Sequence, residues 1–417
     1  MRCSIKHESR TQLLQEQINQ KKEYSVIEEL LYSLSLLVYV LSKYVDLISF
    51  TGEWRYCAVI SVKYFNTALL LLILIQLCLG IGKRIGNEFL QGDIKQALLK
   101  TIFWLAIMVV QWMFFLHIVW KLDREPFYVV VSLYLIAFSR GRSFRRIIGY
   151  LTIAYLIVFA TAASGRVLGF TSDIVKYMDY GAKHAFGMVH PNTAAHILLF
   201  LVMGIWLLFL QKNTAGMYLL FWLSAIVIGI WNRCRTVMGL LIVFPVIVSL
   251  ATKHDITAKR VWKYLTAAAP FLGLFITLIL CIPIDQIHQL TYDTPLFSIG
   301  ERFVQGGIAL RTYGLHLIGQ PIDTSRTIKM VVDGVKISLF VMDNAYLSYG
   351  IIDGLLWLFP CLAYLGAGNG KAWKNKNTGL LIYGVAMLLF ALLERRGLDP
   401  VFNLMFYYPM SLYTIQE

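Results

Sequence analysis

A polar stretch from Asp285 to Asn344 interrupts a 417-residue chain that otherwise consists mainly of apolar runs. Its cationic residues are Arg302, Arg311, Arg326, Lys329 and Lys336, and it closes on Asp343-Asn344. Polar loops of this length are uncommon unless they bind or cover something. Arginine can bind phosphate through paired hydrogen bonds, and a carboxylate can take a proton from a hydroxyl. The stretch therefore predicts a site for an anionic substrate.

The spacing within Gly300–Leu317 separates the two arginines of this stretch. If the segment is helical, at about 100° per residue, Arg302 shares a face with Tyr313 and His316 while Arg311 points to the opposite side. The arginines converge on one ligand only if the helix breaks, and Gly306-Gly307 is the expected place. The alternative is an amphipathic helix lying on the outer membrane surface.

The residues His190-Pro191-Asn192 precede an apolar run. Proline is favoured at a helix start, which would place His190 and Asn192 at the membrane surface beside the positive end of the helix. The alternative is a helix-entry turn with polar caps. Asp343-Asn344 also has two interpretations. The pair is either a helix N-cap, or it provides a carboxylate that acts as a general base on a hydroxyl.

Two further arginines, Arg233 and Arg235, lie between apolar runs. Arginines this close to hydrocarbon are costly unless they are paired or extend to the interface. They fit either phosphate binding or anchoring beside Trp231. Asp353, inside a later apolar run, is a candidate because ionisable residues within membrane spans tend to be functional.

Composition identifies an integral membrane protein. Hydrophobic residues make up 58% of the chain and charged residues 15%, and the mean hydropathy is +0.64. The polar first residues indicate a cytoplasmic tail at 1–25 and no signal peptide, followed by one polytopic domain at 26–417. The six cysteines show no metal-binding spacing, so we expect neither a disulfide nor a metal.

Apolar runs predict an all-α fold of about twelve transmembrane helices, with a large, partly helical outer loop at about 285–344. The expected spans are 26–45, 60–81, 97–119, 126–139, 147–165, 192–211, 216–231, 237–251, 262–284, 346–366, 378–393 and 399–415. Basic loops at 140–146 and 253–260 indicate the cytoplasmic side and place both termini there. The net charge is +14, and an unusual number of cations, among them Lys176 and Lys183, fall on the outer side.

Four strings in this order resemble the bacterial O-antigen and capsular polysaccharide polymerases, in the superfamily that also holds O-antigen ligases. They are HPNTAAH from His190, CRTVMG from Cys234, ERFVQGGIALRTYGLHLIGQPI from Glu301, and DNAYLSYGIIDG from Asp343. The resemblance covers roughly the second half of the chain. Cys234 replaces the usual Ser, and Asp343 stands where ligases have His, which favours a polymerase.

The resemblance implies a multi-pass enzyme of the bacterial cytoplasmic membrane, acting on its outer face without cofactor or metal. It would transfer a growing glycan from polyprenyl diphosphate to a lipid-linked oligosaccharide acceptor. Asp343 or His190 would be the base and Arg302 a catalytic cation. Arg235 and Arg302 would bind the diphosphate, with Arg311 and Arg233 secondary, and Asn192, Asn344, Tyr313 and His316 would orient the acceptor.

The expected partners are the lipid-linked oligosaccharide, the bilayer, and a chain-length regulator and flippase of the same pathway, with no nucleic acid. An O-antigen-type ligase would share the same arginines. A flippase or other transporter should instead carry charges inside its spans. A membrane scaffold would not need outer arginines.

Overall fold

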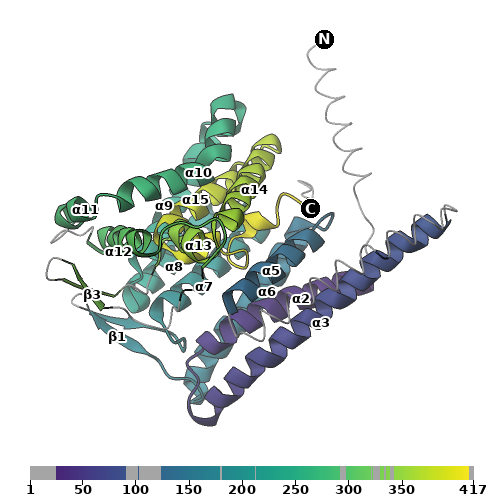
Figure 1. Ribbon diagram of the computed structural model, residues 1–417, viewed down its shortest axis with the longest axis horizontal. Coiled ribbons are helices and arrows are strands. Elements are labelled where there is room, and N and C mark those ends of the chain that lie inside the picture. The colour runs from purple at the N-terminus through teal and green to yellow at the C-terminus, as the bar shows by residue number, and fades with distance from the viewer. Residues whose placement is uncertain are drawn as a thin grey trace. The chain divides into compact units, whose positions relative to one another are not determined.

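The computed structural model describes residues 25–90, 102, 124–178, 181–211, 213–291, 297–320, 322, 329–332, 335–338 and 342–412 (Figure 1). Apart from Ser25 and residue 102, the predicted cytoplasmic tail and the predicted span at 97–119 lie outside this part. Arg326 and the side chains of Lys329 and Lys336 also lie outside it. The chain divides into two compact units, the first made of 1–174, 186–189 and 410–417 and the second of 175–185 and 190–409.

The first unit is built on long helices: α2 (Val26–Tyr44), α3 (Gly52–Leu90), α5 (Arg124–Phe138) and α6 (Phe144–Leu168), with the short turn η1 (Val45–Leu47). α2 packs against α3 and α6. It begins with a capping box, in which Ser25 and Glu28 each accept from the other's backbone N–H. Ser35 on α2 accepts a hydrogen bond from Gln76 on α3 at 2.8 Å, which links the two helices inside the unit.

The second unit starts with a hairpin of β1 (Val175–Met178) and β2 (Gly181–His184). Four apolar helices follow: α7 (Pro191–Ile205), α8 (Thr214–Val227), α9 (Arg235–Lys253) and α10 (Arg260–Cys281). The π-helical turns η2 (Trp206–Leu210) and η3 (Ile228–Asn232) extend α7 and α8, and η4 (Ile256–Ala258) lies between α9 and α10. Such wide turns often lie near functional sites.

The polar stretch is partly helical, as predicted, with α11 (Ile284–Thr291), α12 (Phe297–Tyr313) and the hairpin of β3 (Lys329–Val332) and β4 (Val335–Ser338). The chain continues through α13 (Ala345–Ile352), α14 (Leu355–Lys374) and α15 (Thr378–Leu393). Its last described elements are the turns η5 (Arg395–Leu398) and η6 (Leu404–Phe406).

In the described part of the chain, seven helices are long and apolar enough to cross a membrane. They are 26–47, 52–83, 144–168, 191–210, 214–232, 235–253 and 260–281, and each matches a predicted span. The predicted spans at 126–139 and 378–393 are shorter apolar helices. By helix length and hydropathy this is a multi-pass membrane protein, and its described residues are mainly helical, with two short hairpins among them.

Two of the predicted spans do not form single continuous helices. The run at 346–366 is divided between α13 and α14 by a turn at Asp353-Gly354, where Gly354 has φ +89°. Backbone of the preceding segment covers this turn, because Leu355 N–H donates to the His316 carbonyl at 2.9 Å. The run at 399–415 forms turns as far as it is described, and its apolar side chains, including Phe402 and Tyr407, are buried within the unit.

Candidate functional site

Arg302 on α12 is the centre of a buried polar cluster in the second unit. Its Nε lies 3.2 Å from Oδ2 of Asp343, and its Nη2 donates to Oε1 of Glu394 at 2.8 Å. Its Nη1 donates to the Thr236 hydroxyl at 3.1 Å and to the Leu393 carbonyl at 2.6 Å. A guanidinium has five N–H groups. Arg302 therefore directs most of its donors toward groups of its own protein.

Glu394 links this arginine to a histidine. It follows the last residue of α15, and its Oε2 lies 3.3 Å from Nε2 of His196 on α7. The side chains of Glu394 and His196 are 3% and 5% exposed, whereas that of Asp343 is 25% exposed. Asp343 is thus the carboxylate of the cluster that a substrate can reach.

Charge and burial shift the pKa values of these two carboxyls in opposite directions. Burial alone raises the pKa of Glu394, but His196 and Arg302 outweigh it and lower that pKa to about 2. Burial also raises the pKa of Asp343, and the negative charge of Glu394 raises it further; Arg302 offsets only part, leaving it at about 7. Near neutral pH, Glu394 is ionised and Asp343 is present in both its protonated and its ionised form.

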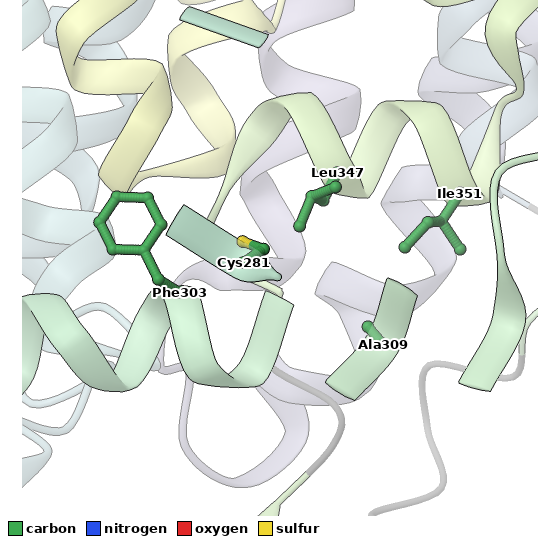
Figure 2. Close-up of a cluster of buried hydrophobic side chains, with 5 residues drawn as sticks. All are labelled: Cys281, Phe303, Ala309, Leu347 and Ile351. Atoms are coloured by element: carbon green, nitrogen blue, oxygen red, sulfur yellow. The ribbon is translucent and has the colours of Figure 1, made fainter. Parts of the chain in front are cut away.

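Close packing of α12 against α10 and α13 fixes the position of Arg302. A Cβ on Gly306 would lie 2.7 Å from Leu347 Cδ1, and one on Gly307 would collide with the Cys281 carbonyl. Figure 2 shows Phe303 and Ala309 of α12 facing Leu347 and Ile351 of α13, with Cys281 between them. The two glycines permit this approach within a continuous helix, so the break that would let Arg302 and Arg311 converge is not present.

Asn344 fixes the start of α13 directly beside Asp343. Its Oδ1 accepts from Leu347 N–H at 3.1 Å, which confirms the predicted N-cap. Its Nδ2 donates to the Thr277 hydroxyl at 3.2 Å and to the Leu392 carbonyl at 2.9 Å. The buried side chain thus ties α13 to α10 and α15, which limits where Asp343 can lie.

The His190 turn begins α7 as predicted, with Pro191 in the first turn. The Nδ1 of His190 accepts from Asn192 N–H at 3.1 Å, and Nε2 lies 2.7 Å from Lys176 Nζ. Burial, followed by nearby Lys176, lowers the pKa of His190 to about 4. Asn192 is half-buried in the first turn.

The predicted arginines lie in different settings. Arg233 has a left-handed backbone at φ +56° after η3, and Arg235 is exposed at the first position of α9, next to Thr236. Arg311 donates from Nη2 to the Ile282 carbonyl at 3.1 Å, at the end of α10, where a cation suits the helix dipole. Arg302 and Arg311 are therefore not equivalent, as their spacing predicted.

Tyr313 and His316 lie away from the cluster. Tyr313 ends α12, about 16 Å along the helix axis from Arg302 at the usual rise per residue. His316 lies beyond the helix end at Gly314, with Nε2 2.9 Å from the Tyr313 carbonyl. Asp353 lies in the turn between α13 and α14 instead of inside a span. The structure does not bring these three residues together with Arg302 and Asp343.

His196, Cys234 and Glu394 place possible metal-ligand atoms within 4.8 Å of one another. The sequence indicated no such group, because its three members are far apart in the chain. Both carboxylate oxygens of Glu394 face partners in the protein, Arg302 and His196. Burial raises the pKa of the Cys234 thiol to about 12, so the thiol is protonated at neutral pH. This arrangement fits an ion-paired cluster better than a metal site.

Sequence reasoning missed Glu394, His196 and Thr236. The available signal was weak: Glu394 is an acidic residue at the end of an apolar helix, and His196 lies inside a predicted span. No protein-family model, curated protein or solved structure matches this chain.

Proposed function

We propose that this protein is a polysaccharide repeat-unit polymerase of the bacterial cytoplasmic membrane, with about twelve spans and a site on the outer face. It transfers a growing glycan from polyprenyl diphosphate to a lipid-linked oligosaccharide. The observation that carries the proposal is the partly accessible Asp343, whose pKa of about 7 suits a general base, held by Arg302. The resemblance of the four strings supplies the substrate class.

The placement of the cluster supports this site. Arg302 contacts Thr236 in the first turn of α9, Glu394 just after α15, and Asp343 just before the cap of α13. Glu394 in turn contacts His196 in the second turn of α7. The basic loop at 253–260 lies at the opposite end of α9, which is about 28 Å long at the usual rise per residue. If basic loops face the cytoplasm, the cluster faces outward, where lipid-linked repeat units are polymerised.

The proposed reaction displaces a diphosphate. Asp343 takes the proton of an acceptor sugar hydroxyl, whose oxygen forms a bond to the anomeric carbon of the donor glycan. The bond from that carbon to the diphosphate oxygen breaks, and its electron pair leaves with the polyprenyl diphosphate. Arg302 keeps part of the Asp343 population ionised, and outer-face cations stabilise the leaving group.

Deletion of the gene, followed by gel analysis of surface polysaccharide, tests the proposal. We expect loss of the long-chain ladder with single repeat units retained, restored by the wild-type gene but not by Asp343→Asn. Asp255→Asn is the matched control, because Asp255 lies in the basic loop at the far end of α9. An unchanged ladder after deletion would overturn the proposal. Loss of all surface repeat units would indicate a ligase or a flippase instead.

A further inference from the structure

The β1–β2 hairpin carries a second group of basic side chains. Lys176 on β1 is directly opposite Lys183 on β2, and opposite residues of an antiparallel pair project from the same face. Gly181 is two residues from Lys183, so its missing side chain would point to that same face. A Cβ there would collide with Nη1 of Arg233. The guanidinium of Arg233 thus lies on the face that carries both lysines.

His190 adds a further hydrogen-bond donor to this group. Because its Nδ1 accepts from Asn192 N–H, the proton of the neutral ring is on Nε2. That N–H lies 2.7 Å from Lys176 Nζ, so a donor faces an ammonium. Burial, together with Lys183, lowers the pKa of Lys176, as expected where cations crowd. An anion accepting from both groups would relieve this contact.

Asn232 holds the parts of the group in register. It is fully buried, and its Nδ2 donates to the His184 carbonyl at the end of β2 and to the Pro191 carbonyl in the first turn of α7. One side chain therefore fixes the hairpin, the His190 turn and the backbone leading to Arg233.

We propose that Lys176, Lys183, His190 and Arg233 form the binding site for the diphosphate of the lipid-linked donor, separate from the Arg302 cluster. This inference depends on the proposed function for the identity of the donor. Arg302 is engaged by two carboxylates and would have to release one to bind phosphate. The hairpin group combines a planar fork with two ammonium groups, which suits a polyanion.

Direct binding to the purified full-length protein in detergent micelles tests this site. The probe is geranylgeranyl diphosphate, with geranylgeraniol as the matched probe without phosphate. Because hydrogen bonds to charged groups contribute strongly, we expect Lys176→Gln/Lys183→Gln to weaken diphosphate binding by about tenfold or more, and Lys176→Arg to retain it. Lys374→Gln, an exposed lysine at the end of α14, is the control and should bind as the wild type does.

Several outcomes would overturn the assignment. Unchanged affinity in the double variant would do so, as would equal binding of geranylgeraniol. Inorganic pyrophosphate binding as tightly as the lipid would indicate a free phosphate ligand, and equal competition by phosphatidylglycerol vesicles would indicate a bilayer headgroup contact. If the double variant binds the lipid diphosphate more weakly but the deletion strain still makes a normal polysaccharide ladder, the binding site stands and the proposed polymerase function is wrong.

Discussion

Arg302 and Asp343 form a salt bridge between α12 and the residue before the cap of α13, with 3.2 Å between Nε and Oδ2. The same guanidinium contacts Glu394, so one cation lies between a carboxyl with a pKa of about 7 and another with a pKa of about 2. This relationship sets the expected pH dependence of the reaction.

The transfer rate of the wild-type protein should rise with pH through about 7. A general base works when unprotonated, and the ionised fraction of Asp343 increases as pH passes its pKa. The measurement is the initial rate against pH with saturating lipid-linked substrate. A rate that stays constant from pH 5 to 9 would exclude Asp343 as the base.

Glu394→Gln and Arg302→Gln should move this profile in opposite directions. Removing the negative charge of Glu394 lowers the pKa of Asp343 and shifts the profile to more acidic pH. Removing the positive charge of Arg302 raises that pKa and shifts the profile to more alkaline pH. Breaking a buried pair costs about 3–5 kcal/mol of stability, so profiles are compared only for protein that remains monodisperse. Shifts in the same direction would contradict the assignment.

Gly307→Ala should reduce both stability and activity. Its Cβ would meet the Cys281 carbonyl, which is backbone and cannot turn aside, so α12 must move and take Arg302 with it. Overpacking of this kind costs about 1–3 kcal/mol. Thermal unfolding and transfer rate are the measurements. Gly239→Ala in α9 is the control, since nothing lies within 4 Å of its Cβ. Equal behaviour of the two variants would disprove the close-approach argument.

Asn344→Ala and Asn344→Asp separate the cap of α13 from the bonds that tie it in place. Alanine removes the cap, at about 0.5–2 kcal/mol, and also both donated bonds. Aspartate keeps an acceptor for Leu347 N–H but loses the donors to Thr277 and Leu392. We expect both variants to unfold at a lower temperature than the wild type. The decrease should be smaller for the aspartate variant, because it keeps the cap. Wild-type stability in either variant would contradict the role assigned to Asn344.

Chelators should leave the transfer rate unchanged. Arg302 and His196 already face the oxygens of Glu394, and the Cys234 thiol is protonated at neutral pH. The test combines the rate after treatment with EDTA and the metal content of the purified protein. Stoichiometric zinc, with activity lost on chelation, would instead identify His196, Cys234 and Glu394 as ligands.

The sequence alone determined the membrane class and most helix positions, because the length of an apolar run and the type of a capping residue are local properties. Pro191 in the first turn of α7, Asn344 as a cap and the opposite orientations of Arg302 and Arg311 all follow from neighbours within a few residues. The same reasoning failed at 399–415, where apolar side chains are buried in turns of the protein.

Only the tertiary structure decided which charges meet. Glu394 and Asp343 lie at the boundaries of different helices, and no local pattern reveals that both contact Arg302. His196 lies within an apolar helix, and only the fold brings it to Glu394. Which charged residues contact one another depends on how α7, α9, α12 and α15 pack. That packing follows from shape complementarity along the full length of the helices. Burial and the nearest charges then set each pKa, so Asp343 acquires a base-like value only in the folded protein.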